Sequence, residues 1–122
     1  MSAIPYCDDV LDPSISLLQL VDAAKNLGVA VTRVQQLLRD HQLLAVRRDG
    51  LLGVPELFFG KNGEIVQWLP GLIAVLHDGG FSDEEMLRWM FRSDDSLPGT
   101  PAEALHGDLA REVIRRAQAM GF

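Results

Sequence analysis

The chain has 122 residues, of which 48% are hydrophobic and 23% charged, and its formal net charge is -6. This length fits one domain-sized core, and no apolar run reaches the roughly 18 residues that a membrane span needs. The single cysteine, Cys7, excludes an internal disulfide, and without a hydrophobic leader pattern we expect a cytoplasmic protein.

The first elements in chain order form a predicted helix-turn-helix. Residues 1–16 hold two prolines and three aspartates without sustained periodicity, which is typical of an irregular acidic tail. Over 17–26, apolar residues recur at three- and four-residue spacings, and Gly28 follows as a helix stop. A second apolar-striped run covers 32–41. Two short helices joined by a glycine-containing turn are typical of a helix-turn-helix.

A β-hairpin is predicted to follow the second helix. The apolar segments 43–46 and 51–54 flank an Asp-Gly pair, whose residues tolerate the positive φ that a tight hairpin turn requires. A second turn is expected at 61–63, between further short apolar segments. These strands would form a wing beside the helices, so 17–66 is expected to be a winged helix-turn-helix domain.

The remaining residues, 67–122, are predicted to form a helical region that packs on the winged domain. Prolines and glycines give each segment a start and a stop, and Ser82 with Glu85 matches a capping box. Helices are expected at 69–77, 84–91, 101–105 and 108–120. The predicted fold class is therefore mainly α with a small β wing.

The last of these helices should bury one apolar stripe and carry ion pairs on its surface. The stripe expected to face the core comprises Leu109, Val113, Ala117 and Met120. Glu112 precedes Arg115 by three residues and Arg116 by four, which are the spacings of helical ion pairs.

The second helix and the hairpin carry the candidate binding residues. The apolar side chains Val34, Leu37 and Leu38 fall within one arc when the helix turns by about 100° per residue. The polar side chains opposite or beside this arc are Thr32, Arg33, Gln35, Gln36 and Arg39. Such side chains can reach base edges and phosphates, and the hairpin adds Arg47 and Arg48. These seven residues are predicted to bind DNA, the alternative being an ordinary solvated surface.

The distribution of charge is compatible with this hypothesis despite the acidic total. Residues 32–48 contain four arginines against one acid, whereas 67–122 contain nine acids against five arginines. The local distribution decides what a surface can bind. A locally basic reader on an acidic body is therefore expected, with modest and salt-sensitive affinity.

Several motifs resemble known families. The stretch LVDAAKNLGVAVTRVQQLLRDHQLLAVRRDG resembles winged helix-turn-helix proteins of the excisionase and MerR type. DDVLDP, LLAVRRDG, LPGLIAVLHDGGFSDEEMLRWMF and ALHGDLAREVIRRAQAMGF together resemble small mycobacterial and corynebacterial winged-helix DNA-binding proteins associated with Ser/Thr protein kinase signalling. This resemblance implies an actinobacterial transcriptional regulator that binds double-stranded DNA through 32–39 and the two wing arginines.

The sequence departs from these families at three points, and a third likeness adds an alternative. RDHQ stands where the families commonly have RDG. Ala30 stands where the recognition helix usually has a Ser or Thr cap, and the tail lacks a threonine that a kinase would target. A kinase partner is therefore implied by resemblance alone. The stretch MLRWMFRSDDSLPGTPAEALHG is similar to the toxin-binding end of certain antitoxins. The alternative function is thus a protein-interaction module whose C-terminal helices bind a protein partner or a second copy.

Other potential sites are weak. The three histidines, His41, His77 and His106, lie far apart in the sequence and no cysteine or paired carboxylate completes a metal site. Because no phosphate loop or catalytic constellation is recognisable, neither an enzyme nor a cofactor is expected. The aromatic residues expected in the core, unless they form an exposed interface patch, are Phe81, Trp68, Trp89 and Phe91.

Overall fold

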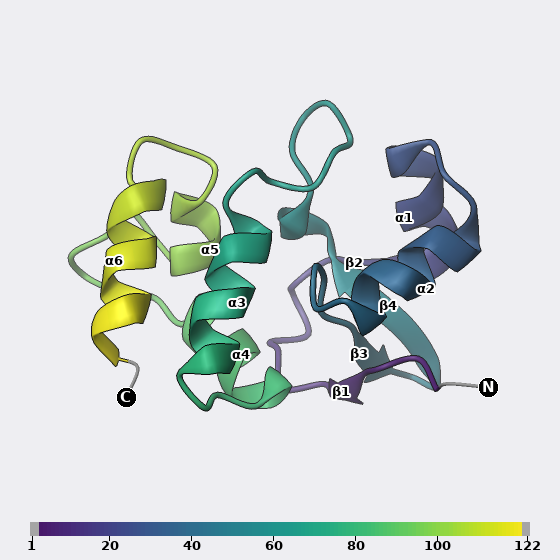
Figure 1. Ribbon diagram of the computed structural model, residues 1–122, viewed down its shortest axis with the longest axis horizontal. Helices are drawn as coiled ribbons and strands as arrows, with labels where there is room; N and C mark the ends of the chain where they lie inside the picture. Colours follow the sequence, from purple (N-terminus) through teal and green to yellow (C-terminus); the bar gives the residue numbers. More distant parts are fainter. Residues whose placement is uncertain (1–2, 121–122) are drawn as a thin grey trace.

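The computed structural model describes residues 3–120, which divide into a sheet-containing half and a helical half (Figure 1). The elements of the first half are β1 (Cys7–Asp8), β2 (Leu17–Gln19), α1 (Leu20–Leu27), α2 (Val31–Arg39), β3 (Val46–Arg48), β4 (Leu51–Pro55) and the 3-10 helix η1 (Glu56–Phe58). Those of the second half are α3 (Leu69–Asp78), α4 (Asp83–Met90), α5 (Pro101–Ala104) and α6 (Ala110–Met120). The predicted fold class is confirmed. No helix among the described residues has the length and apolar character that a membrane crossing requires.

The predicted hairpin forms the centre of a four-stranded sheet with the order β1-β3-β4-β2. β3 and β4 pair in antiparallel fashion, and their turn holds Asp49 at φ 53° and Gly50 at φ 79°. Two consecutive residues at positive φ match the tight turn that an Asp-Gly pair favours. The first strand begins at Val46 instead of residue 43, because Leu43 and Leu44 are buried without joining the ladder.

The two outer strands were not predicted. Residues 17–19, expected at the start of a helix, form β2 and pair with β4, so that Leu18 lies opposite Val54. Two adjacent apolar residues are compatible with the periodicity of a helix and with that of a buried strand, and here the pairing with β4 makes the segment a strand. β1 adds a parallel strand next to β3, with Cys7 opposite Val46. The predicted tail 1–16 therefore contains a strand, and the rest of 3–16 carries no helix or strand, while residues 1–2 lie outside the described residues.

The second predicted turn is present, but the strands around it are reduced to one bridge between Phe59 and Ile65. η1 occupies the position of the expected strand, because the chain leaves the sheet at Pro55. Gly63 has φ 82°, and a Cβ built there would lie 2.6 Å from the carbonyl oxygen of Asn26. The turn therefore approaches the end of α1 more closely than any side chain would allow.

The C-terminal helices follow their predicted start signals, but α6 buries a different stripe. The capping box of Ser82 and Glu85 is present, and Thr100 with Glu103 forms another at α5. The predicted burial of Leu109 and Met120 is wrong, because 39% and 41% of these side chains stay exposed. The residues of α6 that are buried are Ala110, Val113 and Ala117. The predicted ion pairs of Glu112 with Arg115 and Arg116 are confirmed.

One continuous apolar core joins the two halves. Phe58 of η1 is 1% exposed, and its ring lies 5.9 Å from that of Phe91, which follows α4. α5 also packs against η1. The four aromatic residues expected in the core, Trp68, Phe81, Trp89 and Phe91, are half-buried and pack against it. The helical half therefore shares its core with the winged half.

Candidate nucleic-acid interface

Helix α2 is seated on its apolar side and presents polar side chains outward. Val34 and Leu38 are 0% and 2% exposed, and α2 packs on α1. The polar side chains that stay exposed are Thr32, Arg33 and Gln36, and those that are half-buried are Gln35 and Arg39. The apolar and polar arcs expected from helical periodicity are thus both found.

The N-terminal end of α2 carries no internal anion. Ala30 is the N-cap, with extended backbone and no side-chain cap, as its lack of a hydroxyl predicts. The first turn also contains no acidic residue. The free N–H groups and partial positive charge of this helix end are therefore not neutralised by a side chain of α2, and Thr32 and Arg33 lie exposed in the same turn.

The C-terminal end of α2 carries a small hydrogen-bond network. Gln36 Nε2 donates to Asp40 Oδ1 at 2.9 Å, and Arg39 Nη1 donates to Gln36 Oε1 at 3.5 Å. Arg39 Nε is buried and has no hydrogen-bond partner among the described residues. Gln36 is thus held in one orientation by its neighbours, and a bidentate contact with a base would require its amide to turn away from Asp40.

The two arginines of the wing have different surroundings. Arg47 is exposed, and no ion pair of this residue is found within the described part of the chain. The residue next to it on β1 is Asp8, which is also exposed. Arg47 therefore carries an available charge whose field is reduced by one neighbouring acid.

Arg48 points to the other side of the hairpin and is bound internally. Its Nε donates to Asp9 Oδ2 at 2.5 Å and its Nη1 to the carbonyl oxygen of Ile15 at 2.8 Å. The hydrogen bond from Arg48 is the main reason why the pKa of Asp9 lies below its usual value. The sequence analysis assigned both arginines to DNA binding and did not identify Asp9 as the partner of Arg48. In the sequence, Asp9 is only one of several acidic residues of the tail.

The histidines and the cysteine are placed in ordinary structural positions. The rings of His41 and His77 lie 4.7 Å apart, and His77 Nδ1 lies 4.0 Å from Asp78 Oδ1. Within 3–120, no three His, Cys, Asp or Glu side chains form a group that could hold a metal ion. Burial, and then the neighbouring acids, raise the pKa of the Cys7 thiol to about 12, so this thiol stays protonated at neutral pH.

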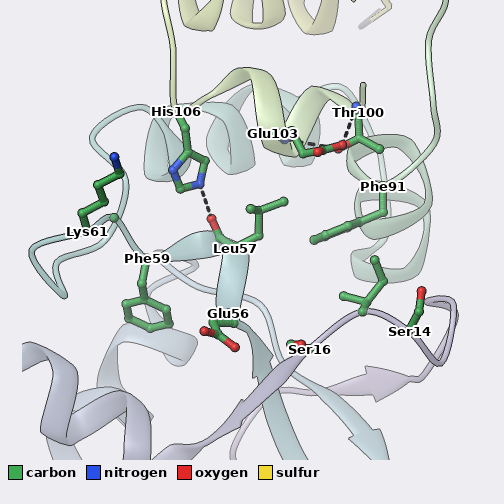
Figure 2. A pocket seen from close by; sticks show the side chains of 12 residues that line it. Ser14, Ser16, Glu56, Leu57, Phe59, Lys61, Phe91, Thr100, Glu103 and His106 are labelled. Atoms are coloured by element: carbon green, nitrogen blue, oxygen red, sulfur yellow. Dashed lines mark hydrogen bonds between the residues drawn. The ribbon is translucent and has the colours of Figure 1, made fainter. Parts of the chain in front are cut away.

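A cleft of about 570 Å³ lies outside the candidate interface, between the tail, η1 and α5 (Figure 2). His106 Nε2 forms a 2.6 Å hydrogen bond with the carbonyl oxygen of Leu57, and Thr100 donates its backbone N–H to Glu103. Phe91 points toward the centre of this cleft (Figure 2). No residue of α2, β3 or β4 lines it, so it is separate from the seven predicted binding residues.

Comparisons with known proteins cover both halves. Residues 3–59 match a family model described as DNA-binding protein Rv2175c, wHTH domain, and residues 66–121 match the Rv2175c C-terminal domain of unknown function. The chain is 46% identical over 134 residues to DNA-binding protein Rv2175c of Mycobacterium tuberculosis, covering 100% of this chain and 92% of the relative. The NMR structure of Rv2175c superposes with a TM-score of 0.88 at 45% identity, covering 99% of this chain and 91% of that one.

Proposed function

The chain belongs to the Rv2175c family of winged helix-turn-helix DNA-binding proteins, and we propose that it binds double-stranded DNA and regulates transcription. The observation that carries this proposal is the exposed polar side of α2, next to a helix end with no internal anion. A helix in the major groove can read base edges with such side chains, and its N-terminus favours a phosphate.

The proposed contacts divide into reading and positioning. Thr32 and Arg33, at the start of α2, face the base edges, and Gln36 joins them when a base replaces Asp40 as its partner. Arg39 and Arg47 neutralise backbone phosphates on either side. Few cations are involved and the chain is acidic overall. We therefore expect modest affinity that depends strongly on salt.

A titration of labelled duplex DNA, followed by fluorescence anisotropy between about 50 and 200 mM salt, tests this function. With two or three phosphates neutralised, log K should fall with log salt with a slope of about 2 to 3. The variant Arg47→Ala should reduce that slope by about 1. Arg92→Ala removes an exposed arginine of the helical half and serves as the matched control, with no expected change. Absence of binding at about 50 mM salt would contradict the proposal.

Base reading by α2 is tested on a duplex selected from a random library. Arg33→Ala should lower the discrimination at one base pair by about 1 to 3 kcal/mol, because a bidentate arginine distinguishes guanine from other bases. The measurement is the affinity for the selected duplex and for its single-base variants. If Arg33→Ala weakens binding to every variant equally, the residue contacts phosphate only.

Two finer expectations stay predictions. The exposed Leu109 and Met120 on α6 are compatible with a protein partner or a second copy at the C-terminal helices, which the antitoxin-like stretch suggested. A Ser/Thr protein kinase is a further partner, implied by the family resemblance in the sequence. A partner at α6 would not cover the proposed DNA contacts, because α6 belongs to the other half of the molecule (Figure 1).

A further inference from the structure

The segment 7–15 is fastened to the wing and to the helical half at the same time. β1 pairs with β3, and the backbone N–H of Cys7 donates to the carbonyl oxygen of Ala45 at 3.1 Å. β1 also contacts α4. Further along, Leu11 is 8% exposed and lies in a group of residues that includes Arg88 and Phe91. The segment therefore connects the strand that carries the wing arginines with α4 of the other half.

The side chain of Arg48 provides the polar part of this attachment. Beyond its bonds to Asp9 and Ile15, its Nη2 donates to the carbonyl oxygen of Asp12 at 3.3 Å. The acceptors thus come from three positions of one segment that lies 33 to 39 residues away in the sequence. Asp9 is held from its other side by the backbone N–H of Leu11 at 3.0 Å. The side chains of Arg48 and Asp9 are only 23% and 19% exposed.

A guanidinium with this set of acceptors has little freedom to reach a DNA phosphate. It would have to leave a carboxylate and two carbonyl oxygens, and it would leave the carboxylate of Asp9 half-buried without its partner. Arg47, the preceding residue on the same strand, has no such bonds among the described residues. The two adjacent arginines therefore have different tasks.

We propose that Arg48 is a positioning residue for DNA binding, which acts by clamping the segment 7–15 onto β3 and so fixing the hairpin that carries Arg47. This inference rests on the proposed function, because it assigns a role within the DNA-binding wing. The clamped segment becomes a structural part of the wing, and it also places Asp8 beside Arg47. Arg48 contributes geometry to the interface, and Arg47 contributes the charge that meets DNA.

The test compares Arg48→Lys, Asp9→Asn and their combination with the wild-type chain in the same salt titration. A lysine keeps the charge but offers one ammonium to acceptors that the guanidinium reaches in a fork. Each single variant should weaken DNA binding about three- to tenfold with an unchanged salt slope, because no phosphate contact is lost. The double variant should be no weaker than either single variant, since both break the same attachment.

Two further measurements separate positioning from general loss of stability. Val113→Ala removes buried methyl groups of α6, which packs on α3 and α5 and not on the segment 7–15, and serves as a control of lowered stability with unchanged DNA affinity. NMR titration of Asp9 should give a pKa below its usual value in the wild-type chain and a return toward that value in Arg48→Lys. Because Asp9→Asn is nearly isosteric, it keeps the test valid if a variant of Arg48 folds poorly.

Specific results in the same salt titration would contradict the positioning role of Arg48. If Asp9 competes with phosphate for Arg48, then Asp9→Asn should bind DNA more tightly with a slope steeper by about 1, and the positioning role is overturned. Full affinity of Arg48→Lys would overturn it as well. A wild-type chain that fails to bind any duplex would instead refute the proposed function, while the Asp9 titration would still report whether the attachment to Arg48 exists.

Discussion

The variant Thr32→Glu should bind duplex DNA at least tenfold more weakly than the wild-type chain while folding at least as stably. A carboxylate in the first turn of α2 interacts favourably with the helix dipole, by about 0.3 to 1 kcal/mol, and no acid or side-chain cap occupies this end now. The same carboxylate would face the electronegative base edges and repel the phosphate that the proposed complex places at this helix end. Tenfold weaker binding corresponds to about 1.4 kcal/mol, and anisotropy titration with thermal unfolding measures both quantities.

The opposite signs of the two effects make this experiment decisive for the placement of DNA. Thr32→Gln has a similar shape without the charge and is the matched control, for which we expect a much smaller loss. Gln118→Glu adds the same charge at an exposed position of α6, away from the interface, and should leave binding nearly unchanged. If Thr32→Glu and Thr32→Gln bind DNA equally well, the N-terminus of α2 does not face phosphate and the proposed docking of the helix is wrong.

Those parts of the fold that depend on local chemistry could be predicted from the sequence. The start of α4 follows from Ser82 and Glu85, which cap each other, and the hairpin turn follows from the positive φ that Asp49 and Gly50 adopt. The two sides of α2 follow from helical periodicity. In each case the determining residues lie within a few positions of one another.

The outer strands could not be predicted, because strands of two and three residues have no periodicity to detect. β1 exists only through its pairing with β3, and β2 only through its pairing with β4. The error on α6 has a related cause. Leu109 and Met120 share a helical side with the buried residues, but the helix begins at Ala110 and its contact with α3 selects the smaller side chains. Such contacts between distant segments determine which of several local options is realised.

The sequence predicted which residues form the candidate interface, but it did not predict that Arg47 and Arg48 have different surroundings. Arg47 and Arg48 are adjacent in a strand, where successive side chains point to opposite faces. The strand position alone therefore indicates that the two side chains start from opposite faces of the hairpin. The sequence contained no signal for the partner of Arg48, because Asp9 lies 39 residues away in an irregular segment.

Phe58→Ala should lower the free energy of unfolding by about 3 to 5 kcal/mol, which is the second large effect that we expect. This side chain is 1% exposed, and its removal leaves a cavity between η1 and the C-terminal helices. A loss of this size is a large fraction of the roughly 5 to 15 kcal/mol that stabilises a typical domain. Urea denaturation measures this loss with two probes: circular dichroism reports the helices of both halves, and tryptophan fluorescence reports the C-terminal half, which contains Trp68 and Trp89.

The form of the transition matters as much as its midpoint. Two family models divide the chain at residues 59 and 66, yet the core continues across that boundary through Phe58 and Phe91. We therefore expect a single transition, seen equally by both probes, in the wild-type chain and in the milder control Phe58→Leu. Two separated transitions in the wild-type chain would show that the halves unfold independently. In that case, binding of a partner to the C-terminal helices would not change the stability of the DNA-binding half. If the core is shared, the same binding stabilises both halves together.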